Sequence, residues 1–123
     1  MMKKKMEAMN HYFDQKIAQC QQRIHVLQTE ERRDEANLEK VRANVYDIFR
    51  TILSVAERTC KDDPDVVRQF FLKKTEQIPA NWVTAHAKAK EHGDVVKMEI
   101  EQIKLDTIAE IRQVFGQIWE ESK

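Results

Sequence analysis

A repeat of apolar residues with alternating steps of four and three runs from residue 13 to residue 59. Eleven of its fourteen positions are apolar, whereas the overall hydrophobic content of 41% predicts about six by chance. This spacing places one side chain per turn on a narrow seam of an α-helix, and no glycine or proline interrupts it. The pattern predicts one long helix over residues 10–59, preceded by a frayed segment at residues 1–9.

The next helix is marked by a proline at each end. Asp62 or Asp63 can cap a helix that has Pro64 in its first turn, where a missing N–H costs nothing. Pro79 ends it, because the residue before a proline resists the α conformation. We therefore expect a short second helix over residues 64–77.

A third helix is predicted over residues 81–121, with two apolar stripes along it. Gly93, followed by Asp94, is its weak point, and a break there is the alternative to a continuous helix. The first stripe consists of Val96, Ile100, Ile103, Thr107, Ile111, Val114 and Ile118. The second stripe consists of Met98, Leu105, Ile108, Phe115 and Trp119.

Two long helices joined through a short one predict a single all-α domain over residues 1–123, a long antiparallel helical hairpin with a capping helix. Residues near 60 then meet residues near 80, which brings Glu31 and Asp34 close to Lys104 and Thr107. We expect these four residues to form a polar layer that fixes the register of the hairpin. The alternative is a turn at residues 29–35, which would give four helices.

The second stripe of the third helix predicts self-association. The short helix spans only about 21 Å and is expected not to reach this stripe. Soluble monomers rarely expose a patch of five large apolar side chains, so we expect a second copy to cover it in a helical bundle about a two-fold axis. The alternative is that the third helix bends at Gly93 and the stripe folds back onto its own chain.

Charge and hydropathy narrow the location and the class of partner. The chain has 21 basic and 21 acidic residues, so it has no general attraction to nucleic acid or anionic membranes. No apolar run follows the lysines at residues 3–5, and none approaches the length of a membrane span. We therefore expect a cytoplasmic protein without membrane contact.

The sequence predicts no catalytic, cofactor-binding or metal-ligating residue. It has no Glu-x-x-His pair, no zinc-ligand spacing and no glycine-rich phosphate loop. We expect a non-enzymatic interaction or scaffold protein, whose partner is a second copy or another helical protein. One alternative is a small DNA-binding regulator that uses residues 66–90 as a helix-turn-helix, with Lys88 and Lys90 supplying positive charge. A helical-bundle enzyme or metal binder is the remaining alternative.

Overall fold

The computed structural model describes residues 2–60 and 63–120, and all regular secondary structure in this part of the chain is helical. The all-α class predicted from the sequence is confirmed. The described residues form five helices: α1 (Met2–Thr29), α2 (Arg33–Cys60), α3 (Pro64–Gln77), α4 (Ala80–Glu91) and α5 (Val95–Glu120).

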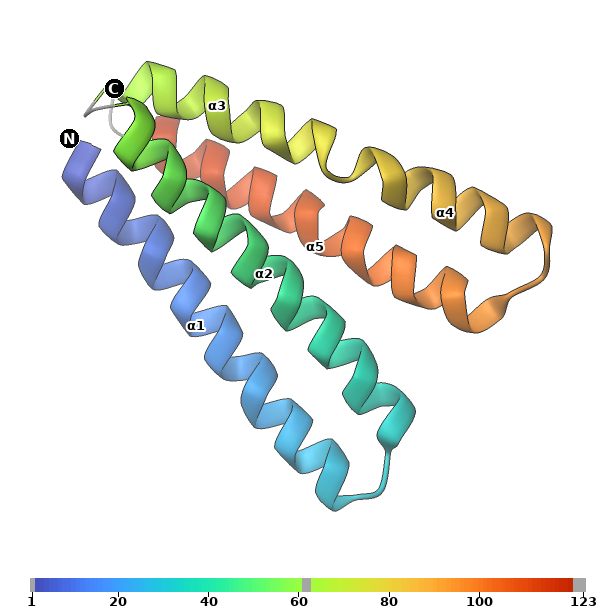
Figure 1. Ribbon diagram of the computed structural model, residues 1–123. Coiled ribbons are helices and arrows are strands. Elements are labelled where there is room, and N and C mark those ends of the chain that lie inside the picture. The colour runs from blue at the N-terminus through green and yellow to red at the C-terminus, as the bar shows by residue number, and fades with distance from the viewer. Residues whose placement is uncertain (1, 61–62, 121–123) are drawn as a thin grey trace.

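These helices make two antiparallel hairpins (Figure 1). In the first hairpin α1 packs along α2, and each helix has 28 residues. In the second hairpin α3, with 14 residues, and α4, with 12, follow one another along α5, which has 26. The hairpins pack together at the end where α1 begins and α5 ends, and they diverge toward their turns.

The long helix predicted over residues 10–59 is wrong, because the chain reverses at Glu31. This residue has φ of 61°, in the left-handed region that ends many helices. The N–H of Arg32 donates to the carbonyl of Leu27 at 2.8 Å, and the N–H of Glu31 donates to that of Gln28 at 3.1 Å. This pair of bonds is a Schellman motif, which satisfies the last carbonyls of α1. The predicted alternative, a turn within residues 29–35, describes the chain correctly.

The continuous helix predicted over residues 81–121 is wrong for the same physical reason. Gly93 has φ of 69°, and the N–H of Asp94 donates to the carbonyl of Ala89 at 2.8 Å. The carboxylate of Asp94 then accepts from the N–H of Lys97 at 3.1 Å and caps the start of α5. The break at Gly93 therefore separates α4 from α5.

The short helix α3 has the bounds expected from its sequence. The side chain of Asp63 accepts hydrogen bonds from the N–H groups of Asp65 and Val66, and Pro64 occupies the first turn. Beyond it, Ile78 and Pro79 both keep right-handed helical backbone angles. The chain therefore runs on into α4 along α5, and residues 66–90 do not form the helix-turn-helix layout that was given above as an alternative (Figure 1).

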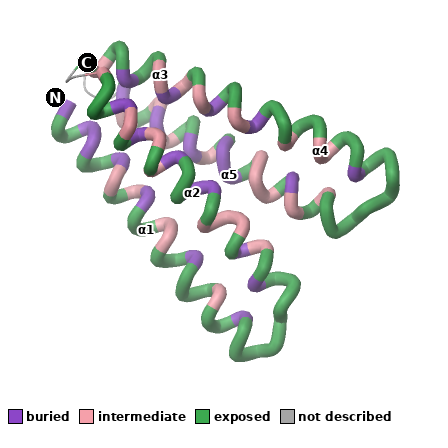
Figure 2. Tube along the Cα trace, viewed as in Figure 1, coloured by how far each residue is buried: buried purple, intermediate pink, exposed green. Residues whose placement is uncertain are grey.

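The hydrophobic core lies at the end where the hairpins meet (Figure 2). Phe13, Phe49, Phe71 and Phe115, one each from α1, α2, α3 and α5, are fully buried there. The rings of Phe71 and Phe115 stack with centroids 4.3 Å apart, and those of Phe49 and Phe71 meet edge to face at 6.1 Å. These aromatic contacts join α2, α3 and α5 in one core.

The frayed segment predicted at residues 1–9 is wrong from residue 2 onward; Met1 lies outside the described residues. Met2, Met6 and Met9 are buried in the core. The ammonium of Lys5 donates to the backbone carbonyl of Trp119 and lies 5.6 Å from the centroid of its ring. The start of α1 is therefore a packed part of the fold.

The stripe predicted as an intermolecular interface is mostly buried within the chain. Ile108, Phe115 and Trp119 are buried, while Met98 and Leu105 are partly exposed. The prediction failed because α3 runs antiparallel to the end of α5, where Trp119 Nε1 donates to the carbonyl of Pro64 at 3.0 Å.

The predicted register layer does not form. Glu31 and Asp34 lie exposed at the turn between α1 and α2. Lys104 pairs with Glu101 at 3.2 Å, and the hydroxyl of Thr107 donates to the carbonyl of Ile103 at 2.7 Å. The four residues are kept apart because the chain reverses at Glu31 and α5 pairs with α3 and α4 along its length.

Candidate functional site

Each hairpin extends beyond the core as a two-helix arm. We define the first arm as residues 23–42, around the turn between α1 and α2, and the second arm as residues 85–104, around the turn between α4 and α5. Burial decreases along both arms toward their turns (Figure 2).

The first apolar stripe defined above lies on α5 and forms its seam. The residues of this seam become progressively more exposed along the second arm. Ile111 is fully buried and Thr107 is 4% exposed. Ile103 and Ile100 are partly exposed, and Val96 is 69% exposed. The steps of three and four between these residues place them on one face of the helix. The face that α5 buries in the core therefore continues into the second arm without full cover.

The seam of α2 behaves in the same way along the first arm. Phe49 and Val45 are buried, whereas Val41 and Leu38 are partly exposed. Near the core α2 packs against α5, and the two helices separate toward the turns. We name Leu38, Val41, Ile100 and Ile103 the inner-face residues, because they continue the seams that meet in the core.

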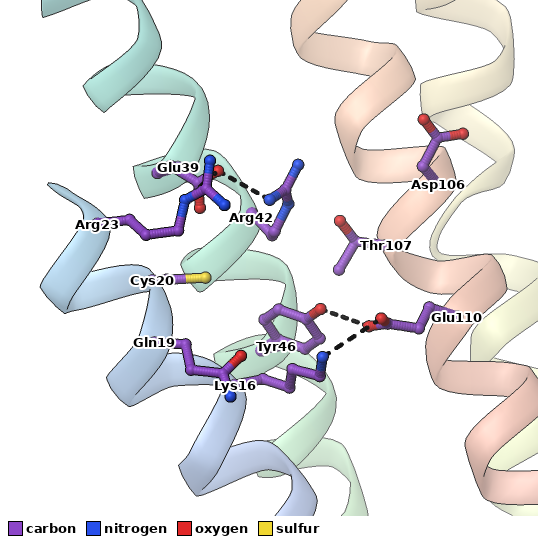
Figure 3. Close-up of a pocket in the computed structure, with 10 residues that line it drawn as sticks. All are labelled: Lys16, Gln19, Cys20, Arg23, Glu39, Arg42, Tyr46, Asp106, Thr107 and Glu110. Atoms are coloured by element: carbon purple, nitrogen blue, oxygen red, sulfur yellow. Dashed lines mark hydrogen bonds and ion pairs between the residues drawn. The ribbon is translucent and has the colours of Figure 1, made fainter. Parts of the chain in front are cut away.

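A polar pocket of about 310 Å³ lies where the hairpins begin to diverge (Figure 3). Side chains from α1, α2 and α5 line it, among them Lys16, Cys20, Tyr46 and Glu110. The helices that form it are the ones that carry the seams, so the pocket marks the base of the two arms.

One carboxylate in this pocket joins three helices. The hydroxyls of Tyr12 and Tyr46 both donate to Oε2 of Glu110, at 2.6 Å for Tyr12. The ammonium of Lys16 lies 3.6 Å from Oε1 of the same residue. Tyr12 and Lys16 belong to α1, Tyr46 to α2 and Glu110 to α5, so this group fixes the first hairpin to the second.

The surroundings shift the pKa values of Tyr12, Tyr46, Cys20 and Glu110 in directions that keep these four groups in their ordinary forms at neutral pH. Burial, followed by the hydrogen bond to Glu110, raises the pKa of Tyr12, and the same two causes raise the pKa of Tyr46. Burial alone would raise the pKa of Glu110, but the bonds from Tyr12 and Tyr46 and the charge of Lys16 outweigh it and lower that pKa. Burial, with the nearby charge of Glu39, raises the pKa of the Cys20 thiol to about 11. The tyrosines and the thiol therefore stay protonated and Glu110 stays ionised.

Each arm contains one buried acid with a base three residues later. Glu39 Oε1 accepts from Arg42 Nη1 at 2.8 Å and lies 3.5 Å from Arg23 Nε. Glu101 Oε1 accepts from Lys104 Nζ at 3.2 Å. The second oxygen of each acid has no hydrogen-bond partner in the described part of the chain. These pairs are the polar layers of the fold, and of the residues predicted for such a layer only Lys104 belongs to one.

The sequence contains a signal for the burial of Glu39, which lies on a different face of α2 from the seam. Ala36, Glu39, Ala43 and Tyr46 recur at steps of three and four on the face of α2 that turns toward α1. Small residues on such a stripe allow a close approach of the neighbouring helix, which buries the one acid among them.

Three further observations concern a metal site, a membrane-spanning helix and similarity to known proteins. Within residues 2–60 and 63–120, no group of three or more histidine, cysteine, aspartate or glutamate side chains is placed to hold a metal ion. None of these helices combines the length and the apolar character needed to span a bilayer. Comparison with protein-family models, with curated proteins and with solved structures finds no match to this chain.

Proposed function

We propose that this chain is a non-enzymatic protein–protein interaction module that binds helical partners on the inner faces of its two arms. The observation that carries the proposal is the graded exposure of the two seams. In each, one apolar face passes from full burial in the core to partial exposure in the arm. Apolar side chains at spacings of three and four are what an amphipathic helix recognises in a groove-type interface.

The pocket supports a structural role for its polar residues. A general base or a nucleophile needs a pKa near the working pH, and the environment here moves the pKa of Tyr12, Tyr46 and Cys20 away from neutrality. Glu110 is held ionised by two hydroxyl donors and one ammonium group from the other hairpin, which suits a fixed joint between α1, α2 and α5.

Charged side chains beside the inner-face residues would orient a partner. Arg42 and Lys104 each follow an inner-face residue directly in sequence, and each has its charge balanced by a buried acid. Such pairs add more to the orientation of a bound helix than to its affinity. The affinity would come from the apolar residues.

Photo-crosslinking in cells tests this proposal. A photoreactive amino acid is placed at Val41 or Ile103, on the inner faces, and at Lys40 or Gln102 as matched exposed neighbours. We expect adducts at one or a few defined masses from the two inner-face positions and not from the two controls. An Ile100→Glu substitution should remove the adduct formed at residue 103. Equal labelling at all four positions, or an adduct that survives Ile100→Glu, would contradict the proposal.

A further inference from the structure

The two hairpins are built to the same plan, with equivalent residues 62 positions apart. Glu31 and Gly93 are the left-handed residues of the two turns, and each is followed by the residue that closes the Schellman motif, Arg32 and Asp94. The element lengths agree as well, because α3 and α4 together match α5 as α1 matches α2.

Five pairs of buried residues follow the same relation. The pairs Met9 and Phe71, Phe49 and Ile111, and Leu53 and Phe115 are all fully buried. The pairs Val45 and Thr107 and Tyr46 and Ile108 are also buried. Few of these pairs are chemically alike, so the correspondence lies in the packing of the hairpins rather than in their residue identities.

The polar layers repeat too. Glu39 and Glu101 are 62 positions apart, are 5% and 6% exposed, and each pairs with the base three residues later. In each pair the acid has a second carboxylate oxygen without a hydrogen-bond partner in the described residues. The two arms therefore have a buried acid paired with a base at equivalent positions, and Glu39 has Arg23 as an additional partner.

The inner faces are equivalent by the same relation. Leu38 corresponds to Ile100 and Val41 to Ile103, and all four side chains are partly exposed. The chain thus presents one kind of apolar surface twice, on helices that separate from a common base. A partner that covers both faces in the same way must itself offer two equivalent surfaces.

We propose that the partner is a second copy of this chain, with the arms of the two copies interleaved so that their four inner faces meet in one core. This inference rests on the proposed function, because it names the helices that the arms bind. A copy of the chain offers two equivalent apolar surfaces on arms of matching length, and closed two-fold assembly covers them all at once.

The accessible surface of the chain is large enough to supply a standard protein–protein interface. The chain of 123 residues has an accessible surface of 8081 Å² for a mass of 14.6 kDa. A compact monomer of that mass exposes about 6,900 Å², so the excess is about 1,200 Å². A standard interface buries about 800 Å² on each partner, which the excess can supply.

The charge of the chain places no barrier against self-association. Its formal net charge is zero at pH 7, so two copies have no net repulsion. On the arms the acids and bases are interspersed, as in the pairs Glu39 with Arg42 and Glu101 with Lys104. Two copies can therefore approach without bringing blocks of like charge together.

Light scattering coupled to size exclusion tests the inference. At roughly 100 µM, well above the Kd of a weak specific interface, we expect the wild type to have twice the 14.6 kDa mass of one chain. Val41→Glu and Ile103→Glu should each give the mass of a single chain with unchanged circular dichroism. The matched controls Asn37→Glu and Gln102→Glu, at exposed positions of α2 and α5, should keep the double mass. If a glutamate variant fails to fold, Val41→Ser and Ile103→Ser provide the milder change.

The outcomes separate this inference from the proposed function. A wild type with the mass of one chain, together with a photo-crosslink from residues 41 and 103 to a different protein, overturns the second copy and leaves the interaction module standing. A single-chain mass with no site-specific crosslink overturns both. A double mass that persists in both glutamate variants overturns the inner faces as the surface of association.

Discussion

At the scale of single residues, the two turns place chemically different side chains in the same backbone conformation. Gly93 adopts its positive φ without strain, whereas Glu31 has a Cβ that clashes in the left-handed region. Glycine marks the second turn in the sequence and makes a break there a natural alternative. Glu31 carries no such mark, so the seam favours a continuous helix over residues 10–59 and the turn at residues 29–35 remains only the alternative.

This difference predicts opposite responses to substitution. Glu31→Gly should raise the free energy of unfolding by about 1 kcal/mol, and Gly93→Ala should lower it by about 1 kcal/mol. Gly116→Ala is the control, since Gly116 lies within α5 with open space around it and alanine should stabilise it by roughly 0.5–1 kcal/mol. Urea unfolding measures all three. Changes of the same sign at Gly93 and Gly116 would contradict the left-handed turn.

The carboxylate of Glu110 predicts a dependence of stability on pH. Its pKa is lowered in the folded chain, so its contribution to stability is present above about pH 4.3, the ordinary pKa of glutamate, and is lost as the pH falls through the lower folded pKa. Glu110→Gln should therefore be less stable than the wild type at pH 7, and the difference should shrink toward pH 3. Glu76→Gln, which removes an exposed acid 3.7 Å from Arg112, should show a much smaller change over the same range. A stability difference for Glu110→Gln that does not vary with pH would refute this role.

At the scale of helices, the sequence predicts the ends of a helix best where capping residues and prolines determine them. Proline and an aspartate cap fix α3, whose bounds matched the prediction. The start of α1 carries a signal in the sequence, because Met2, Met6 and Met9 continue the steps of four and three back from Phe13. The prediction of a frayed segment gave more weight to the terminal position of these residues than to their spacing, and packing in the core stabilises the segment as a helix.

The first turns of α1 should therefore contribute to the stability of the whole fold. Met9 is fully buried, so Met9→Ala should lower the free energy of unfolding by about 2–5 kcal/mol. Glu7→Ala, at an exposed position of the same segment, should change it by less than about 0.5 kcal/mol. Chemical denaturation followed by circular dichroism distinguishes the two. Equal small effects would mean that this segment is not packed as described.

At the scale of the whole molecule, the sequence showed that seams exist but not which helices they join. The first stripe of the third helix was assigned to a partner in the first helix, and the second stripe to another copy. In the structure the second stripe packs against α3 and the N-terminal part of α1, through Phe71 and Lys5. Both stripes are buried near the core and partly exposed in the second arm, the first at Ile100 and Ile103 and the second at Met98 and Leu105. The reversal at Glu31, given above only as the alternative, changes which helices the stripes contact.

The position of the core at one end has a mechanical consequence. Phe13, Phe49, Phe71 and Phe115 hold the hairpins together where they meet, while each arm is supported only by its own pair of helices. The arms can change their separation by small bends near the joint without breaking the core contacts. If the arms bind a helix as proposed, the width of that helix would set the separation of the two turns.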